Sequence, residues 1–394
     1  MDEIRNPYGP GAGTPPPALV GREAELRAFA IKLERAKLGR PAKSLLATGL
    51  RGVGKTVLLN RFVEIAERSG YRNAFMEASD GGSFVRLLAV HVRTLLFELD
   101  RLGALSERVK RAMRVFRSFT GRFGLDGVLS FSIDVDPERG SGDSGDLAAD
   151  LTALMVALGE AARDRRTAVL LAIDELQYLD GAELSSLIMA IHRTTQLALP
   201  IVLVGAGLPQ MPALAGEARS YSERLFDFPR IGELRSEDAR RAVEEPAAAQ
   251  DIRFTRAALD AIVQVTHGYP YFVQEWAYHV WNHAPASPIG VEVVESVTPL
   301  ILAHLDASFF RVRYERCTPT QRRYLRAMAE LGGGAHRSGE IADIYGAKVT
   351  SLAPVRGQLI RQGLIFSPGH GDTAFTVPLF DEFMKRAMPR LDSV

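Results

Sequence analysis

The chain has 394 residues, which is enough for two or three domains. With 46% hydrophobic and 24% charged residues, its composition is that of an ordinary soluble globular protein. Lys and Arg number 48 against 47 Asp and Glu, so the net charge alone predicts no polyanionic partner.

The only cysteine, Cys317, excludes an internal disulfide and a metal site built from several cysteines. It fits a reducing cytoplasm, and the N-terminus lacks the basic and then apolar pattern of a secretion signal. The longest uncharged run, Thr194–Gly216, contains Pro200, Pro209 and Pro212, so we expect a buried strand and a loop rather than a membrane helix. The sequence therefore predicts a cytoplasmic protein without a membrane partner.

The first 18 residues are rich in proline and glycine, which predicts an extended arm. A helix is expected to begin within residues 19–26 and to run to about residue 35. An apolar run with the character of a strand then starts at Ser44 and stops at Gly49.

A glycine-rich motif, Gly49-x-x-x-x-Gly54-Lys55-Thr56, follows that strand and opens a helical pattern that Gly70 ends. Strand, glycine loop and helix in this order are typical of a phosphate-binding loop, because the glycines let backbone N–H groups turn toward phosphate oxygens. The start of the helix adds partial positive charge. Lys55 is expected to reach the β- and γ-phosphates of ATP, and the Thr56 hydroxyl to bind Mg²⁺. The predicted nucleotide contacts of this segment are Gly49, Arg51, Gly52, Val53, Gly54, Lys55, Thr56 and Val57.

Five strand-like segments alternate with helical ones, which predicts a doubly wound α/β layer with a parallel sheet. The segment Ala168–Ile173 is apolar without interruption, as expected for a strand covered on both faces. The other predicted strands are the one at Ser44 and residues 72–78, 201–204 and 226–231, and 128–136 is expected to be a further strand or hairpin. Helices are predicted at 83–99, 106–119, 146–163 and 183–195.

Two carboxylates, Asp174 and Glu175, come directly after the apolar strand. This is the Walker B arrangement, in which one carboxylate is neutralised by the metal while the other stays available as a base. We expect Asp174 to hold Mg²⁺ through water and Glu175 to orient and polarise the attacking water. The alternative is a solvated strand end without a catalytic role.

Four motifs occur in the order that AAA+ ATPases use: Val20-Gly-Arg-Glu-x-Glu-Leu26, the phosphate loop, Ala172-Ile-Asp-Glu-Leu-Gln-Tyr178 and Gly268-Tyr-Pro270. The chain resembles the archaeal-type, initiator (origin-recognition-like) and STAND-related branch over roughly residues 19–310. The resemblance implies an α/β nucleotide domain with a helical lid and a homo-oligomer when ATP is bound. It implies that Val20, Gly21 and Arg22 lie beside the adenine and that Tyr269 and Pro270 border the nucleotide.

The resemblance also implies an arginine finger near the fifth strand, for which Arg224 is the first choice and Arg219 and Arg230 are rivals. Two features depart from the family pattern. The fourth strand ends in Gly205-Ala-Gly207, where these enzymes usually carry a polar sensor residue, and Gln210 is a candidate substitute. The lid has Gly-Tyr-Pro in place of an arginine, which leaves room for a slow switch rather than a fast motor.

After about Leu234 the strand signal stops, and helices are predicted at 236–249, 255–266 and 270–283. In the last of these, Glu275, His279 and His283 share one face at i, i+4 spacing. This spacing could hold a metal ion, although a face of the lid helix that packs within the protein is the simpler interpretation.

The C-terminal residues 311–394 hold 13 Lys and Arg against 8 Asp and Glu, a balance of +5. Helices predicted at 319–331, with Thr318 as N-cap, 338–345 and 348–362 precede a hairpin of 364–366 and 374–377. This order is typical of a winged helix, whose third helix enters the major groove of DNA. Because Pro354 fits only a first helical turn, the regular part of the third helix is expected to begin near Leu352. Winged helices also dock proteins or form dimers, and that alternative stays open. The predicted DNA contacts are Lys348, Thr350, Ser351, Arg356, Arg361 and, in the wing, His370.

The predicted organisation is an arm (1–18), a P-loop ATPase α/β core (19–235), a helical lid (236–310) and a winged-helix domain (311–394). The predicted function is an ATP-binding and ATP-hydrolysing AAA+-type switch or remodeller that uses Mg²⁺ and acts on or with duplex DNA. One alternative is a STAND-like signalling ATPase with a protein-binding winged helix. Another is a nucleotide-binding scaffold with little turnover.

Overall fold

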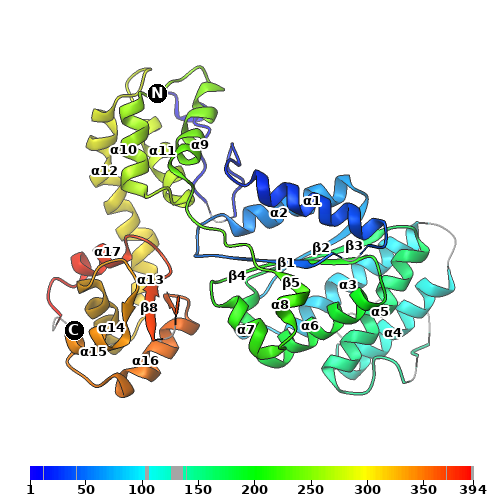
Figure 1. The fold of residues 1–394 in the computed structure, drawn as a ribbon. Helices are drawn as coiled ribbons and strands as arrows, with labels where there is room; N and C mark the ends of the chain where they lie inside the picture. Colours follow the sequence, from blue (N-terminus) through cyan, green and yellow to red (C-terminus); the bar gives the residue numbers. More distant parts are fainter. Residues whose placement is uncertain are drawn as a thin grey trace. The chain divides into compact units, whose positions relative to one another are not determined.

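A computed structural model describes residues 1–11, 13–40, 42–102, 106–125, 136–138, 140–369 and 371–391 (Figure 1). The chain divides into two compact units. The sheet unit comprises Glu23–Thr48 and Leu58–Arg230. The loop-and-lid unit comprises Met1–Arg22, Gly49–Val57 and Ile231–Val394.

The sheet unit contains the predicted parallel five-stranded sheet, in the order β2-β3-β4-β1-β5. Its last strand is shorter than predicted, since β5 covers two residues and Arg230 joins the sheet only through an isolated bridge with Thr48. Pro229 explains the difference, because proline has no N–H to donate to a sheet ladder. The strands are β1 (Ser44–Thr48), β2 (Tyr71–Glu77), β3 (Ala168–Asp174), β4 (Ile201–Gly207) and β5 (Phe226–Asp227).

Helices cover both faces of this sheet, with α1 and α2 on one face and α3, α5 and α6 on the other (Figure 1). The two short helices α7 and α8 were not predicted, and the segment 128–136 lies outside the described residues except for Asp136. The helices are α1 (Glu23–Lys37), α2 (Lys55–Arg68), α3 (Phe84–Arg101), α4 (Glu107–Arg122), α5 (Leu147–Asp164), α6 (Gly181–Gln196), α7 (Met211–Ala218) and α8 (Ser222–Leu225).

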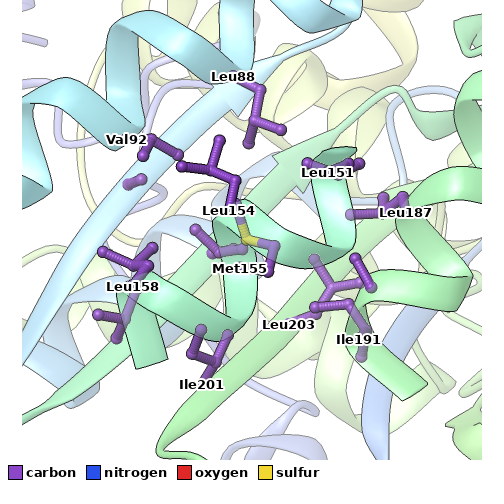
Figure 2. Packing of buried hydrophobic residues seen from close by; sticks show 14 of the residues in the cluster. Leu88, Val92, Leu151, Leu154, Met155, Leu158, Leu187, Ile191, Ile201 and Leu203 are labelled. Carbon is purple, nitrogen blue, oxygen red and sulfur yellow. The ribbon is translucent and has the colours of Figure 1, made fainter. Parts of the chain in front are cut away.

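The strand β3, which pairs with β2 on one side and β4 on the other, is buried along its whole length. Its alternate residues Val169, Leu171 and Ile173 belong to a core cluster with apolar side chains of α3, α4, α5 and α6. Figure 2 shows side chains of this cluster from α5, such as Leu154 and Met155, beside Leu203 of β4. Because successive strand residues point to opposite faces, both faces of β3 are apolar and the sequence run is uninterrupted.

In the loop-and-lid unit, the three predicted lid helices are present and a fourth, α12, was not predicted. The N-terminal arm packs on this lid rather than extending freely. The Met1 ammonium donates to the Ala284 carbonyl oxygen at 2.7 Å, and the Trp281 indole N–H donates to the Asp2 carbonyl oxygen at 3.0 Å. The lid helices are α9 (Ser236–Ala248), α10 (Arg256–Thr266), α11 (Pro270–His283) and α12 (Val291–Leu305).

The predicted boundary at residue 311 falls inside a helix that is continuous over Val291–Glu315. A five-residue π-helical stretch, Asp306–Phe310, joins α12 to α13 (Arg311–Glu315). By length and composition alone this 25-residue segment could cross a membrane, a test that core helices of globular proteins also pass, and 33% of its most apolar window is buried in the structure.

The C-terminal module contains the three predicted helices and the predicted hairpin, which a short strand extends to a sheet of order β6-β8-β7. The third helix begins at Val349, not near Leu352, so Pro354 lies inside it and removes one N–H from the helical ladder. A last helix, α17, was not predicted. The elements are α14 (Pro319–Glu330), β6 (His336–Arg337), α15 (Ser338–Tyr345), α16 (Val349–Arg361), β7 (Ile365–Phe366), β8 (Asp372–Phe375) and α17 (Phe380–Ala387).

Candidate nucleotide site

The glycines of the phosphate loop have different physical roles. Gly52 and Gly54 adopt left-handed conformations with φ of +82° and +91°, which side chains strongly disfavour. Gly49 is required for space, because a Cβ there would lie 2.1 Å from the Ile231 carbonyl oxygen. A Cβ on Gly54 would meet no heavy atom of the described residues within 4 Å, so the loop is open on that side.

Lys55 is the first residue of α2 and is 6% exposed. Its ammonium donates to the Leu50 carbonyl oxygen of the same loop at 2.7 Å. The helix N-terminus at Lys55 and Thr56 supplies partial positive charge from backbone N–H groups. A buried cation at a helix start is well suited to bind a polyphosphate.

The predicted adenine-side residues lie in the same unit as the loop. The buried Arg22 guanidinium donates to the Val53 carbonyl oxygen at 3.4 Å and to the carbonyl oxygen of Gly232. Gly21 has a φ of +72°, and a Cβ there would lie 3.0 Å from Asp238 of α9. Arg22 therefore ties the loop to the segment that leads into the lid, while the adenine contact of Val20, Gly21 and Arg22 stays a prediction.

The start of lid helix α11 also contacts the loop. The Tyr271 N–H donates to the Gly52 carbonyl oxygen at 3.2 Å, and a Cβ on Gly52 would lie 3.0 Å from the Tyr269 ring. Tyr269 is 2% exposed, and burial raises the pKa of its phenol well above the usual range. Pro270 follows as the first residue of α11. The Gly-Tyr-Pro motif therefore borders the phosphate loop in this unit, and its contact with nucleotide stays a prediction.

Sequence reasoning missed two neighbours of the loop residue Arg51. The Arg51 guanidinium lies 2.8 Å from the point where a Cβ on Gly363, just after α16, would be. Arg313 of α13 has its guanidinium carbon 3.9 Å from the centre of the Phe309 ring. Burial, together with the nearby Arg51 cation, lowers the pKa of Arg313 to about 10. More than 250 residues separate Arg51 from both positions, so no local pattern in the sequence could reveal them.

The carboxylate pair belongs to the sheet unit. Asp174 is the last residue of β3 and is 2% exposed, whereas Glu175 is half-buried. Ile173 is in register with Gly205 of β4, and Gly205 is in register with Leu46 of β1. Because these strands are parallel, β3 and β1 end at the same edge of the sheet, and the phosphate loop begins directly after β1.

The sensor position at the end of β4 is filled by its neighbours. A Cβ on Gly205 would lie 2.3 Å from the Leu176 side chain, and one on Gly207 would lie 2.3 Å from the Met211 side chain. Gln210, the predicted substitute, is the residue before α7, and its buried side-chain oxygen has no hydrogen-bond partner among the described residues. Close packing therefore accounts for the two glycines.

The three candidate arginine fingers differ in exposure. Arg224 on α8 and Arg230 are exposed. Arg219 is half-buried, and its Nε donates to the Ser185 hydroxyl of α6 at 2.9 Å. Arg219 therefore has a local structural role, and Arg224 and Arg230 are the side chains that a neighbouring molecule could reach.

The predicted DNA-binding residues fall into two groups. Lys348, Thr350, Ser351 and Arg361 are exposed at the two ends of α16. The Arg356 guanidinium is bonded inside the module, donating to the Thr373 hydroxyl at 2.7 Å, the Ser367 hydroxyl at 2.9 Å and the Asp372 carbonyl oxygen at 2.7 Å. These bonds assign Arg356 to holding the hairpin on α16. His370 lies outside the described residues.

The possible metal site on α11 is explained by contacts within the lid. The Glu275 carboxylate accepts from the Tyr271 hydroxyl at 2.6 Å and lies 3.5 Å from His279 Nε2. His283 Nδ1 lies 2.8 Å from the His279 carbonyl oxygen. Among the residues that the structure describes, no group of three or more His, Cys, Asp or Glu side chains could hold a metal ion.

Comparisons with known proteins agree with this architecture. Residues 18–204 match the family model described as an AAA ATPase domain, and residues 307–384 match a model described as a domain of unknown function. The Walker-type ATPase PABY2304 of Pyrococcus abyssi has a TM-score of 0.55 at 15% identity, covering 93% of this chain and 96% of that one. No curated protein matches the chain.

Two further solved structures are similar at lower scores. The RuvB Holliday junction branch migration motor of Thermotoga maritima has a TM-score of 0.45 at 17% identity, covering 90% of this chain and 92% of that one. The Aeropyrum pernix ORC1 protein in complex with DNA has a TM-score of 0.43 at 16% identity, with 94% of each chain covered. The family model thus finds residues 18–204 similar to an AAA ATPase domain, and the parallel sheet lies largely within this segment.

Proposed function

We propose that the protein binds ATP with Mg²⁺ at the phosphate loop and hydrolyses it to ADP and phosphate as an AAA+-type switch. The observation that carries the proposal is the loop itself, with Gly52 and Gly54 in left-handed conformations and the buried Lys55 ammonium at the start of α2. In this proposal Lys55 binds the β- and γ-phosphates, and Glu175 polarises the attacking water. Thr56 and Asp174 hold Mg²⁺, which neutralises phosphate charge.

The contacts of the loop support a switch rather than a plain hydrolase. Gly52 accepts from the Tyr271 N–H of the lid, and Arg51 lies against Gly363 of the C-terminal module. A change in loop conformation on binding or losing the γ-phosphate would therefore act directly on both. A ligand shifts such an equilibrium only by its differential affinity for the two states, so ATP and ADP are expected to bind the full chain with different affinities.

The test is the ATPase rate of the full-length protein with Mg²⁺ and with excess EDTA, measured with and without duplex DNA. Nucleotide affinity is measured in parallel with a fluorescent ATP analogue. Mg²⁺-dependent turnover supports the proposal. Tight nucleotide binding without turnover, with or without DNA, favours the nucleotide-binding scaffold instead. Absence of both binding and turnover refutes the assignment of the loop.

We further propose that residues 311–394 form a winged helix that binds duplex DNA through the start of α16. The supporting observation is the exposed first turn, in which Lys348, Thr350 and Ser351 project from the module. Lysine contacts to phosphates contribute affinity, whereas hydroxyls near base edges contribute sequence preference. The signalling alternative, in which the module binds protein, is favoured if the full chain fails to bind duplex DNA at low salt both with and without ATP.

A further inference from the structure

The turn after the Walker B carboxylates places a second polar side chain on Glu175. Gln177 lies in a short 3₁₀ turn, Leu176–Tyr178, directly after Glu175. Its side-chain amide nitrogen donates to Glu175 Oε2, while its amide oxygen accepts from the Leu208 N–H at 3.1 Å. One amide therefore joins the carboxylate to the chain just beyond β4. The two bonds also fix which end of the amide is nitrogen and which is oxygen.

The end of β4 is shaped to admit this turn. A Cβ on Gly207 would lie 3.1 Å from the Gln177 amide oxygen, closer than most real contacts of this kind. A Cβ on Gly205 would lie 2.3 Å from the end of the Leu176 side chain, so Leu176 could not keep its present position. The two glycines that replace a polar sensor residue are thus the positions that allow Leu176 and Gln177 to pack against β4.

The backbone of Glu175 is itself held in an unusual conformation. Its φ of 54° and ψ of 40° are left-handed, which is uncommon for a residue with a side chain. Its N–H donates to Asp174 Oδ1 at 2.8 Å. Such conformations persist only where the surroundings impose them, and they concentrate at functional sites. Asp174 therefore bonds the backbone of Glu175, and Gln177 bonds its carboxylate.

We propose that Gln177 is a positioning residue for Glu175 and replaces the polar sensor side chain that the end of β4 lacks. The bond engages Oε2 of the carboxylate, and polarising a water molecule requires one oxygen, Oε1. Through the Leu208 N–H, the orientation of Glu175 follows any shift of the β4 end. This inference rests on the proposed ATPase function, because the position of Glu175 has a kinetic consequence only if Glu175 is the base.

The experiment compares full-length Gln177→Ala with wild type in steady-state hydrolysis. A matched control is Gln196→Ala at the exposed end of α6. Positioning predicts that Gln177→Ala lowers kcat by about tenfold or more, with nucleotide affinity and melting temperature within error of wild type. The control is expected to keep the wild-type kcat. Gln210→Ala, measured beside them, is expected to lose less than Gln177→Ala.

Two further variants separate positioning from a general structural effect. On a Glu175→Gln background, Gln177→Ala is expected to cause no further loss, because residues that act through one another are not additive. Gln177→Glu cannot donate to an ionised Glu175, so its kcat is expected to recover toward acid pH, where the new carboxyl is protonated. A pH–rate profile parallel to wild type contradicts that role.

The outcomes distinguish this inference from the proposed function. If wild type hydrolyses ATP and Gln177→Ala keeps its kcat, the positioning role is wrong while the ATPase stands. If Gln177→Ala loses kcat, affinity and thermal stability together, the glutamine is structural and the inference is overturned. If wild type itself shows no turnover above Lys55→Ala, the proposed function fails first and the inference fails with it.

Discussion

Lys55 is the residue on which the proposed nucleotide site depends most directly. Its ammonium is buried and bonded to the Leu50 carbonyl oxygen within the loop. We predict that Lys55→Ala abolishes ATP binding, because a polyphosphate on the loop then lacks its main counter-charge. Equilibrium titration with a fluorescent ATP analogue measures this, with Lys37→Ala on the exposed end of α1 as the control. Undiminished affinity in Lys55→Ala would refute the loop assignment.

Glu175 has a different predicted role, in turnover rather than in binding. Glu175→Gln preserves shape and hydrogen-bonding capacity but cannot polarise water. We therefore expect ATP affinity near that of wild type and a loss of hydrolysis of at least about a hundredfold. Single-turnover measurements with saturating ATP check this. A wild-type rate would mean that another group activates the water.

At the scale of elements, the helix α16 and its hairpin depend on one arginine. The Arg356 guanidinium makes three hydrogen bonds to the β7–β8 hairpin, two of them to hydroxyls and one to a backbone carbonyl oxygen. We predict that Arg356→Ala destabilises the C-terminal module by about 2 kcal/mol, since its partners lose bonds they cannot fully replace. Hydrogen exchange of the β8 amides measures this loss of stability within the module and is expected to become faster. Arg361→Ala, on an exposed position of the same helix, is expected to leave exchange unchanged.

The exposed start of α16 leads to a prediction about DNA. Removing Lys348 is expected to lower affinity for all duplex sequences and to reduce the slope of log affinity against log salt by about one unit. Changing Thr350 or Ser351 is expected to alter sequence preference instead. Fluorescence anisotropy of labelled duplexes with full-length protein over a salt series measures both. Equal binding by wild type and the Lys348 variant at every salt concentration would contradict the contact.

At the scale of the whole molecule, the exposed Arg224 concerns assembly. An arginine supplied by a neighbouring copy stabilises charge on the transferred phosphoryl group. Arg224→Ala is therefore expected to bind ATP normally and to hydrolyse it about a thousandfold more slowly. Mixing this variant with Lys55→Ala is expected to restore part of the activity. In a mixed assembly, an Arg224→Ala subunit keeps an intact loop, and a neighbouring Lys55→Ala subunit supplies the intact arginine. A wild-type protein that stays monomeric with ATP, by particle mass, rules out this role.

The assembly prediction has an internal control in Arg230. Arg230 is also exposed and lies near the short strand β5, where it pairs with Thr48 through one isolated bridge. If Arg230→Ala, rather than Arg224→Ala, shows normal binding and slow hydrolysis, the finger is Arg230. Arg219 is a poorer candidate because its guanidinium is bonded to Ser185.

The sequence by itself determined the parts of this protein that depend on local patterns. The phosphate loop, the carboxylate pair after β3 and the parallel sheet follow from glycine spacing, apolar runs and turn residues that act within a few positions of one another. The capping box at Thr318 and the left-handed Gly346 at the end of α15 were predictable for the same reason. The rule that proline fits only a first helical turn was too strict for Pro354, because α16 begins at Val349 and continues through this residue.

Only the tertiary structure decided which distant residues surround the loop and the carboxylates. Arg313 and Gly363 beside Arg51, and the bridge that Gln177 makes to Leu208, join positions whose proximity depends on how packed elements meet. The arm is another case: its composition predicts an extended chain, and hydrogen bonds to the lid hold it in place. Such contacts arise because burial and hydrogen bonding are satisfied for the fold as a whole. The residues adjacent to a position in the sequence therefore do not reveal these distant contacts.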